Sequence, residues 1–169
     1  GCTTYSFSVN LASDLPWVPR QDPRAVKEVR GRLRPDEWEC PLRGRLFRGF
    51  AQPELDRRDI WYIDPKATYL ERAVEDVRQC LLAQGLEWFD QFADTPSILR
   101  VFCEADPSDA LWGFGGNPSP NRSYLIGYSA LRAGDRALAQ EHLQKALESG
   151  CFEGVGPALE QALSEARTV

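Results

Sequence analysis

Methionine is absent from the sequence, and histidine occurs once. Since translation begins at methionine, Gly1 is not the native start of the chain, and we expect the first domain to be incomplete at its N-terminus. The single histidine, His142, excludes a metal site built on several imidazole ligands. It lies among the glutamines and glutamate of a helical pattern, so we interpret it as a surface residue and not as a catalytic base.

Long apolar runs are also lacking. No segment approaches the roughly 20 apolar residues of a membrane-spanning helix. The composition, with 43% hydrophobic and 27% charged residues, is that of an ordinary soluble globular protein. We therefore expect a cytoplasmic protein that does not enter a membrane.

The cysteines lack the spacing of a metal site. They form no CxxC pair, they are odd in number, and no histidine stands near them to complete a zinc centre. We expect reduced thiols that pack as small apolar side chains, and no metal or other cofactor. The five are Cys2, Cys40, Cys80, Cys103 and Cys151.

The glycine-rich stretch at residues 113–120, GFGGNPSP, lacks the Lys and the Ser or Thr of a nucleotide-binding phosphate loop. It also follows a helical pattern instead of a strand. We interpret it as a connector, so the sequence contains no recognisable catalytic or cofactor motif.

Charge is distributed unevenly along the chain. Residues 1–63 carry 11 basic and 9 acidic side chains, whereas residues 64–169 carry 9 and 16. The chain as a whole has a net charge of -5. Because an acidic surface repels a phosphate backbone, we do not expect a nucleic-acid partner.

Strand patterns occupy the first third of the chain. Four apolar residues alternate with polar ones and predict a half-buried strand; they are Tyr5, Phe7, Val9 and Leu11. Residues 38–46, where Trp38, Cys40, Leu42 and Leu46 share one parity, and the apolar run at 59–64 predict two further strands. We expect these two to pair in antiparallel fashion across a long connection. Residues 21–33 predict at most a short surface helix or a loop.

Helical patterns fill the rest of the chain. Apolar residues three and four apart predict a long amphipathic helix over residues 65–84, with Gly85 as its stop. Thr95 followed by Pro96 predicts the start of another helix. The fold class is therefore α+β, with an antiparallel sheet of three to four strands from residues 3–64, packed by helices. We place an α+β domain at residues 3–106 and a helical appendage at residues 107–169.

One helical hairpin within the appendage has the pattern of a tetratricopeptide repeat. Small residues that allow close helix approach occur at its offsets, Gly134 forms the turn, and Asp135 caps the second helix. No second copy follows at about 34 residues. We expect this hairpin to pack on the domain, followed by a third helix after Pro157.

Alternating arginines on the strand at residues 38–46 supply the candidate binding site. Arg43 and Arg45 share a parity opposite to the apolar residues, and Arg57 and Arg58 follow across the connection. Such a face is suited to an anionic ligand or an acidic partner. The alternative is a solvated sheet surface on which arginine stems cover aromatic rings. The candidate binding residues are Trp38, Arg43, Arg45, Arg48, Trp61 and Tyr62.

The order of these segments resembles the uncharacterised bacterial family known as domain of unknown function 4304. The resemblance covers residues 3 to 102. It implies a small α+β domain and brings no activity and no catalytic residues. The residues that carry it are Val9, Asn10 and Leu11, then Trp38, Cys40 and Arg43, then Trp61, and finally Gly85, Leu86 and Trp88.

The leading functional hypothesis is a non-enzymatic protein-interaction module of the immunity or accessory type, with an unidentified protein partner. It rests on the missing catalytic motifs, the acidic helical half and the helical hairpin. The alternative hypothesis is a small-molecule or anion-binding domain, or a weak hydrolase, that uses the arginine and tryptophan face.

Overall fold

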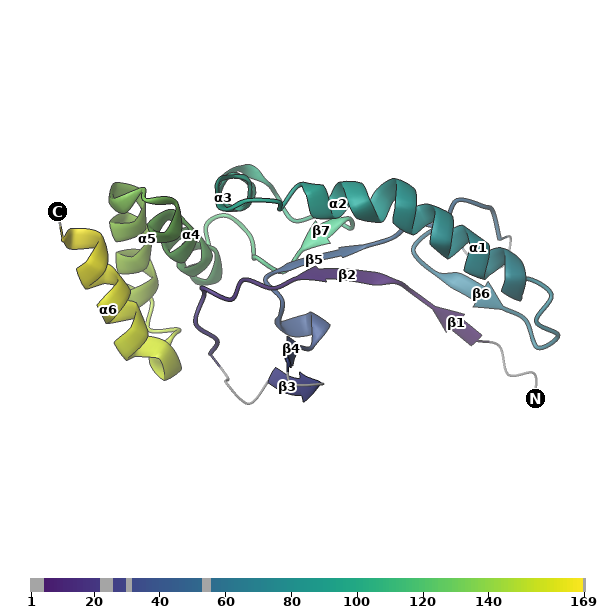
Figure 1. Ribbon diagram of the computed structural model, residues 1–169, viewed down its shortest axis with the longest axis horizontal. Coiled ribbons are helices and arrows are strands. Elements are labelled where there is room, and N and C mark those ends of the chain that lie inside the picture. The colour runs from purple at the N-terminus through teal and green to yellow at the C-terminus, as the bar shows by residue number, and fades with distance from the viewer. Residues whose placement is uncertain (1–4, 22–25, 30–31, 53–55, 169) are drawn as a thin grey trace.

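The computed structural model describes residues 5–21, 26–29, 32–52 and 56–168. Short strands form most of its first part and helices fill most of its second part, which confirms the predicted α+β class (Figure 1). The elements are β1 Tyr5–Phe7, β2 Asn10–Ser13, β3 Val26–Val29, β4 Arg32–Pro35, η2 Glu37–Glu39, β5 Leu42–Arg45, β6 Trp61–Ile63, α1 Leu70–Cys80, η3 Leu81–Gly85, α2 Leu86–Asp90, α3 Thr95–Glu104, β7 Leu111–Trp112, α4 Pro120–Ala133, α5 Arg136–Glu148, η4 Glu153–Val155 and α6 Gly156–Arg167.

Within the described residues all strand pairs are antiparallel, and they form three small sheets: β2-β5-β7, β1-β6 and β3-β4. The expected pairing of the strands at residues 38–46 and 59–64 is wrong, because β5 pairs with β2 and β6 pairs with β1. The single strand predicted at residues 5–11 is instead divided between β1, which pairs with β6, and β2, which pairs with β5. A backbone bond from Leu46 N to Val9 O joins the two pairings. Alternation alone fixes which face is buried, not which strand is the neighbour.

Two elements were predicted as something else. The helix or loop expected within residues 21–33 is wrong for the described part, where β3 and β4 pair as a hairpin; residues 22–25 and 30–31 lie outside the described residues. β7, which pairs with β5 through Arg43↔Trp112 and Gly44↔Leu111, lies within residues 107–169, which we predicted as a helical appendage. β7 therefore carries residues from beyond position 106 into the sheet.

Helix α1, the π-helical turn η3 and α2 follow one another without a break, and we call them together the long helix. We predicted that Gly85 ends this helix, and that prediction is wrong. Gly85 has a helical φ of -69°, and the helix continues through it. A Cβ at Gly85 would lie 2.7 Å from Leu81 Cδ1 and 3.5 Å from Leu46 Cδ2, so glycine serves close packing here. The long helix lies along the strands (Figure 1).

Two apolar clusters form the core. The first gathers strand residues with the long helix, α3, Phe114 and part of α4, including the fully buried Trp61 and Phe102. The second holds α4, α5 and α6 together. Because α4 contributes to both, the helical part is packed directly onto the α+β part.

The predicted helical hairpin is present as α4 and α5. Gly134 has a φ of 84° between the helices, and the Asp135 side chain accepts a hydrogen bond from Leu138 N. A Cβ at Gly127 would lie 2.8 Å from Leu143 Cγ, which shows how closely the two helices approach. The turn and the cap were predicted correctly. At α3 the cap is Asp94, which accepts from Ser97 N, and not Thr95 as predicted.

Candidate functional site

Strand β5 presents its arginines on one face, as its sequence parity predicts. Leu42, Gly44 and Leu46 are buried, while Arg43 and Arg45 are half-buried. A Cβ at Gly44 would lie 2.3 Å from Trp88 Nε1, so the buried face of β5 rests directly on the long helix. The opposite face, with the arginines, therefore points away from the core.

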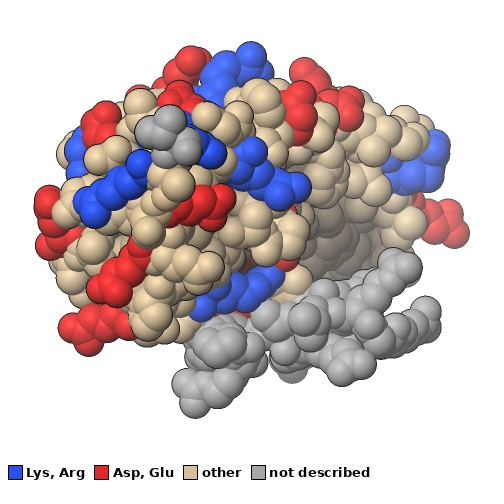
Figure 2. Space-filling view, turned by 60° about the vertical axis from the view of Figure 1, so that its left-hand side comes forward, with Lys and Arg blue, Asp and Glu red and all other residues tan. Residues whose placement is uncertain are grey.

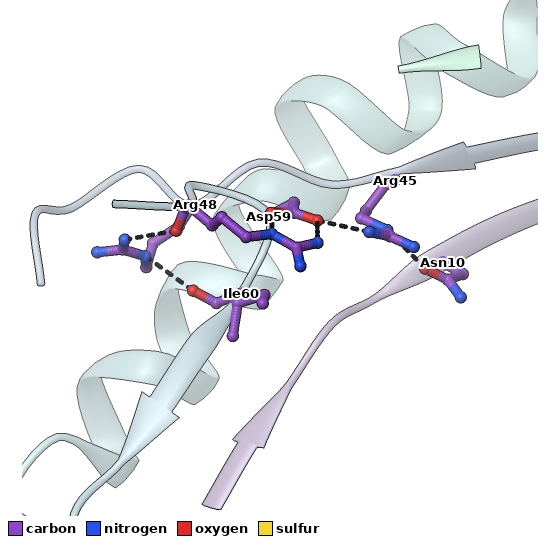
Figure 3. A network of polar contacts seen from close by, with 6 residues as sticks. Asn10, Arg45, Arg48, Asp59 and Ile60 are labelled. Atoms are coloured by element: carbon purple, nitrogen blue, oxygen red, sulfur yellow. Dashed lines mark hydrogen bonds and ion pairs between the residues drawn. The ribbon is translucent and has the colours of Figure 1, made fainter. Parts of the chain in front are cut away.

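Arg45 lies at the centre of a polar network. Its Nε donates to Asn10 Oδ1 at 3.0 Å, and its Nη1 donates to Asp59 Oδ2 at 2.5 Å. Arg57 binds both oxygens of the same carboxylate, with Nε at 3.0 Å from Oδ1 and Nη2 at 2.5 Å from Oδ2. Figure 3 shows Arg45 reaching Asn10 on one side and Asp59 on the other. One carboxylate thus holds two guanidinium groups together.

The ionisation of Asp59 reflects this arrangement. The hydrogen bonds from Arg57 lower the pKa of Asp59 to about 2, partial burial opposes the change, and the bond from Arg45 lowers the pKa further. Asp59 is therefore charged at any physiological pH. Its negative charge offsets only one of the two arginines.

The network borders a cleft of about 800 Å³. Trp112 of β7 forms part of its wall, and the Arg45 guanidinium carbon lies 5.2 Å from the centre of the Trp112 ring. The lining residues are Arg45, Phe47, Arg57, Arg58, Asp59, Ser108, Asp109 and Trp112. We call this the arginine cleft.

Arg48, Trp61 and Tyr62, which the sequence placed in the candidate site, do not line the arginine cleft. Arg48 is 3% exposed, and its guanidinium donates to three backbone carbonyls, those of Phe50, Arg57 and Ile60. Figure 3 shows the contact with Ile60. Trp61 is fully buried and donates from Nε1 to Asp76 Oδ2 at 2.9 Å. Tyr62 pairs with the Gln52 side chain through its backbone. Arg48 and Trp61 therefore serve the fold.

Trp38 lines a different cavity, of about 360 Å³, together with Cys40. Burial, with a further contribution from Asp14, raises the pKa of the Cys40 thiol to about 11, so the thiol is protonated and a poor nucleophile. Arg43 lines neither cavity and lies opposite Trp112 in the strand register. Of the six predicted residues, only Arg45 lines the arginine cleft with Arg57 and Arg58.

Sequence reasoning missed Asn10, Asp59 and Trp112. The signal for Asp59 was its position directly after the Arg57–Arg58 pair, since a carboxylate beside two arginines is a ready ion-pair partner. Trp112 had no signal, because β7 spans only two residues and shows no periodicity.

The long helix exposes a row of large apolar side chains, which we call the apolar stripe. Its members are between 40% and 60% exposed, and they are Leu70, Val74, Leu81, Leu82, Leu86 and Phe89. The described chain has only three other exposed large hydrophobic residues, Tyr5, Phe7 and Trp38. The long helix therefore carries most of the exposed large apolar side chains of the described residues.

Within the described ranges, no three His, Cys, Asp or Glu side chains are grouped so that they would hold a metal ion. The described helices include none with the length and apolar character needed to cross a bilayer. His142 is half-buried on α5, where burial lowers its pKa. On the face seen in Figure 2, acidic and basic side chains are interspersed over the C-terminal helices.

When the chain was compared with family models, curated proteins and solved structures, no match was found. The resemblance to domain of unknown function 4304 therefore stays a prediction. The functional argument rests on the geometry of the chain.

Proposed function

We propose that this protein is a non-enzymatic protein-interaction module that binds its partner through the apolar stripe of the long helix. The observation that carries the proposal is the exposure of six large apolar side chains on one helix that is otherwise packed on the sheet. Burying an exposed side chain of this size on binding is favourable by about 1 kcal/mol or more. A cluster of six is sufficient to drive a specific contact.

The charges on the long helix indicate the chemistry of the partner. Residues 70–90 contain five acidic and two basic side chains. Arg78 is already paired with Glu75 at 2.7 Å, and the Arg72 guanidinium carbon lies 4.3 Å from the centre of the Phe50 ring. Glu71, Glu87 and Asp90 are exposed, so the rim of the stripe is acidic. A partner with basic residues at the edge of its own apolar face fits this rim.

An amphipathic helix of another protein matches both features. The stripe runs over 20 residues of helix, about 30 Å, and a helix that lies along it would place apolar residues at spacings of three and four against it. A second copy of this chain fits less well, because it would bring a second acidic rim against the first. We therefore propose a basic, amphipathic helix as the occupant.

The proposal includes a bacterial cytoplasmic location. The described cysteines, Cys40, Cys80, Cys103 and Cys151, are free. Free thiols are usual in proteins of a reducing compartment.

The test compares three forms of the full chain: wild type, the stripe variant Leu86→Gln with Phe89→Gln, and the control variant Ala133→Gln with Ala137→Gln. The control changes two exposed helical positions outside the stripe. The probes are two fluorescent amphipathic helical peptides with the same apolar face, one flanked by lysines and one by glutamates. We expect wild type and control to bind the lysine peptide at least about tenfold more tightly than the glutamate peptide.

The stripe variant should bind the lysine peptide at least about tenfold more weakly than wild type. Binding that is unaffected by Leu86→Gln with Phe89→Gln would contradict the proposal. So would a wild-type dimer in sedimentation velocity that this variant converts to a monomer, since the occupant would then be a second copy of the chain. Equal binding of both peptides would contradict the basic partner.

A further inference from the structure

We infer that the arginine cleft is a binding site for an organic phosphate, a small molecule in which a phosphate monoester is joined to an apolar group. The site is separate from the apolar stripe, and no residue of the stripe lines the cleft. The inference therefore goes beyond the proposed protein-interaction function and does not depend on it.

The first argument is that three guanidinium groups converge on one cleft. Arg45 comes from β5, and Arg57 and Arg58 come from the segment before β6. Positive charges that line the same cleft repel one another, so bringing the three guanidinium groups together has an energetic cost. Asp59 offsets part of that cost by binding Arg45 and Arg57 directly, which also fixes their positions. A site with fixed donors loses little entropy when a ligand binds.

The second argument is that donors remain available. Among the described residues, Arg45 Nη2 and Arg57 Nη1 have no acceptor, because the contacts of these side chains use their other nitrogens. Arg58 makes one weak contact, from Nη2 to Arg48 O at 3.4 Å. Phosphate oxygens accept paired hydrogen bonds from guanidinium groups in the geometry that these forks offer.

The third argument is charge balance. Three arginines and two aspartates line the cleft, so it keeps a net charge of +1 within a chain whose net charge is -5. A phosphate monoester carries about -1.5 to -2 at pH 7, which more than offsets this excess. A cationic ligand would meet repulsion, and an uncharged ligand would leave the excess positive charge unbalanced.

The organic part of the ligand follows from the remaining walls. The cleft of about 800 Å³ falls in the size range of small-molecule sites and exceeds the space that a phosphate ion needs. Phe47 and Trp112 line it beside the arginines. Aromatic walls next to a cluster of arginines favour a ligand that carries an apolar or planar group on its phosphate.

The experiment uses two probes, inorganic phosphate and phenyl phosphate, titrated into the full chain by calorimetry at constant ionic strength. We expect phenyl phosphate to bind at least about fivefold more tightly than inorganic phosphate, because only phenyl phosphate contacts the aromatic wall. Arg58→Gln should weaken phenyl phosphate binding about tenfold, since it removes one charged donor. It should leave the melting temperature unchanged, because Arg58 makes only one weak contact.

Arg100→Gln is the matched control. It removes the same charge from an exposed position on α3, outside the cleft. Binding within about twofold of wild type in this control supports the site. An equal loss in Arg58→Gln and Arg100→Gln would overturn it, as would the absence of binding by wild type at millimolar phenyl phosphate. Equal affinities for the two probes would overturn the organic part of the assignment. The Leu86→Gln with Phe89→Gln variant should bind phenyl phosphate normally, so this inference and the proposed function fail separately.

Discussion

Helix α4 is buried along nine consecutive residues, 122–130, whereas the long helix leaves six large apolar side chains exposed. The two helices differ in what surrounds them: α4 contacts α3 and α5 extensively, with a smaller contact to α6. The long helix rests on the strands and has no described element over its stripe.

The chain itself fills the face of the hairpin that we expected to support interactions. The Tyr124 hydroxyl donates to Pro19 O at 2.7 Å, and Trp17 and Val18 pack against the cluster of α4, α5 and α6. A peptide would have to displace this segment to reach α4. The contrast teaches that a repeat-like pattern indicates how helices pair, while the exposed apolar side chains that support the proposed partner site lie on another helix.

The largest loss in the free energy of unfolding is expected at Arg122, where α4 is most enclosed. Its Nε donates to Phe102 O at 2.5 Å and its Nη2 donates to Ala105 O, so it caps the C-terminal end of α3 from a position that is 1% exposed. Arg122→Ala leaves two buried carbonyls unsatisfied. We expect it to lower the free energy of unfolding by about 3 kcal/mol in urea denaturation. Arg132→Ala, on the exposed end of the same helix, should cost less than about 1 kcal/mol; equal losses would contradict the contrast.

A somewhat smaller effect is expected at Gly127, where α4 meets α5. Gly127→Val must push against Leu143, whose backbone nitrogen lies 3.0 Å from the new Cβ. The overpacking should lower the free energy of unfolding by about 2 kcal/mol. Leu82→Gln on the open face of the long helix should change it by less than about 0.5 kcal/mol, because that side chain is already half exposed. A large loss in Leu82→Gln, measured by the same denaturation, would show that the stripe is not an open surface.

The smallest effect on the free energy of unfolding is expected at Asp59 in the arginine cleft, and this effect depends on pH. The pKa of Asp59 falls from 3.8 to about 2 on folding. The contribution of ionised Asp59 to the free energy of unfolding is therefore complete above about pH 4 and is lost as the pH falls through about 2. With allowance for solvent screening, Asp59→Asn should cost about 1 kcal/mol at pH 6. The difference from wild type should vanish near pH 2, and a difference that stays constant from pH 6 to pH 2 would contradict the role of the ion pairs.

The parts of the fold that local signals determine could be predicted from the sequence. The turn at Gly134 and the cap at Asp135 depend on neighbours within a few residues, and both were correct. Strand pairing was not predictable, because the partners of β5 lie 29 to 35 residues before it and more than 60 residues after it. β7 has too few residues to show alternation.

The candidate site also has a part that the local sequence predicts and a part that only the folded chain determines. The shared face of Arg43 and Arg45 is a property of one strand, and parity was sufficient to predict it. Whether a neighbouring arginine turns outward or inward depends on the backbone carbonyls that fold around it. Arg48 was misplaced because its partners lie in the loop after β5, 2, 9 and 12 residues further along the chain. Trp61 was misplaced for a similar reason, since its indole finds Asp76 on the long helix.

The π-helical turn η3 has a geometric consequence for the long helix. An α-helix rotates by about 100° per residue, and a π-helical turn accommodates one extra residue. In an uninterrupted α-helix, Leu86 and Phe89 would therefore lie about a quarter turn away from Leu70 and Val74. The extra residue restores the phase, so the two halves of the helix share one outer edge while Ala73 and Trp88 share one inner edge. A single inserted residue thus determines that this helix presents one continuous surface and not two short ones.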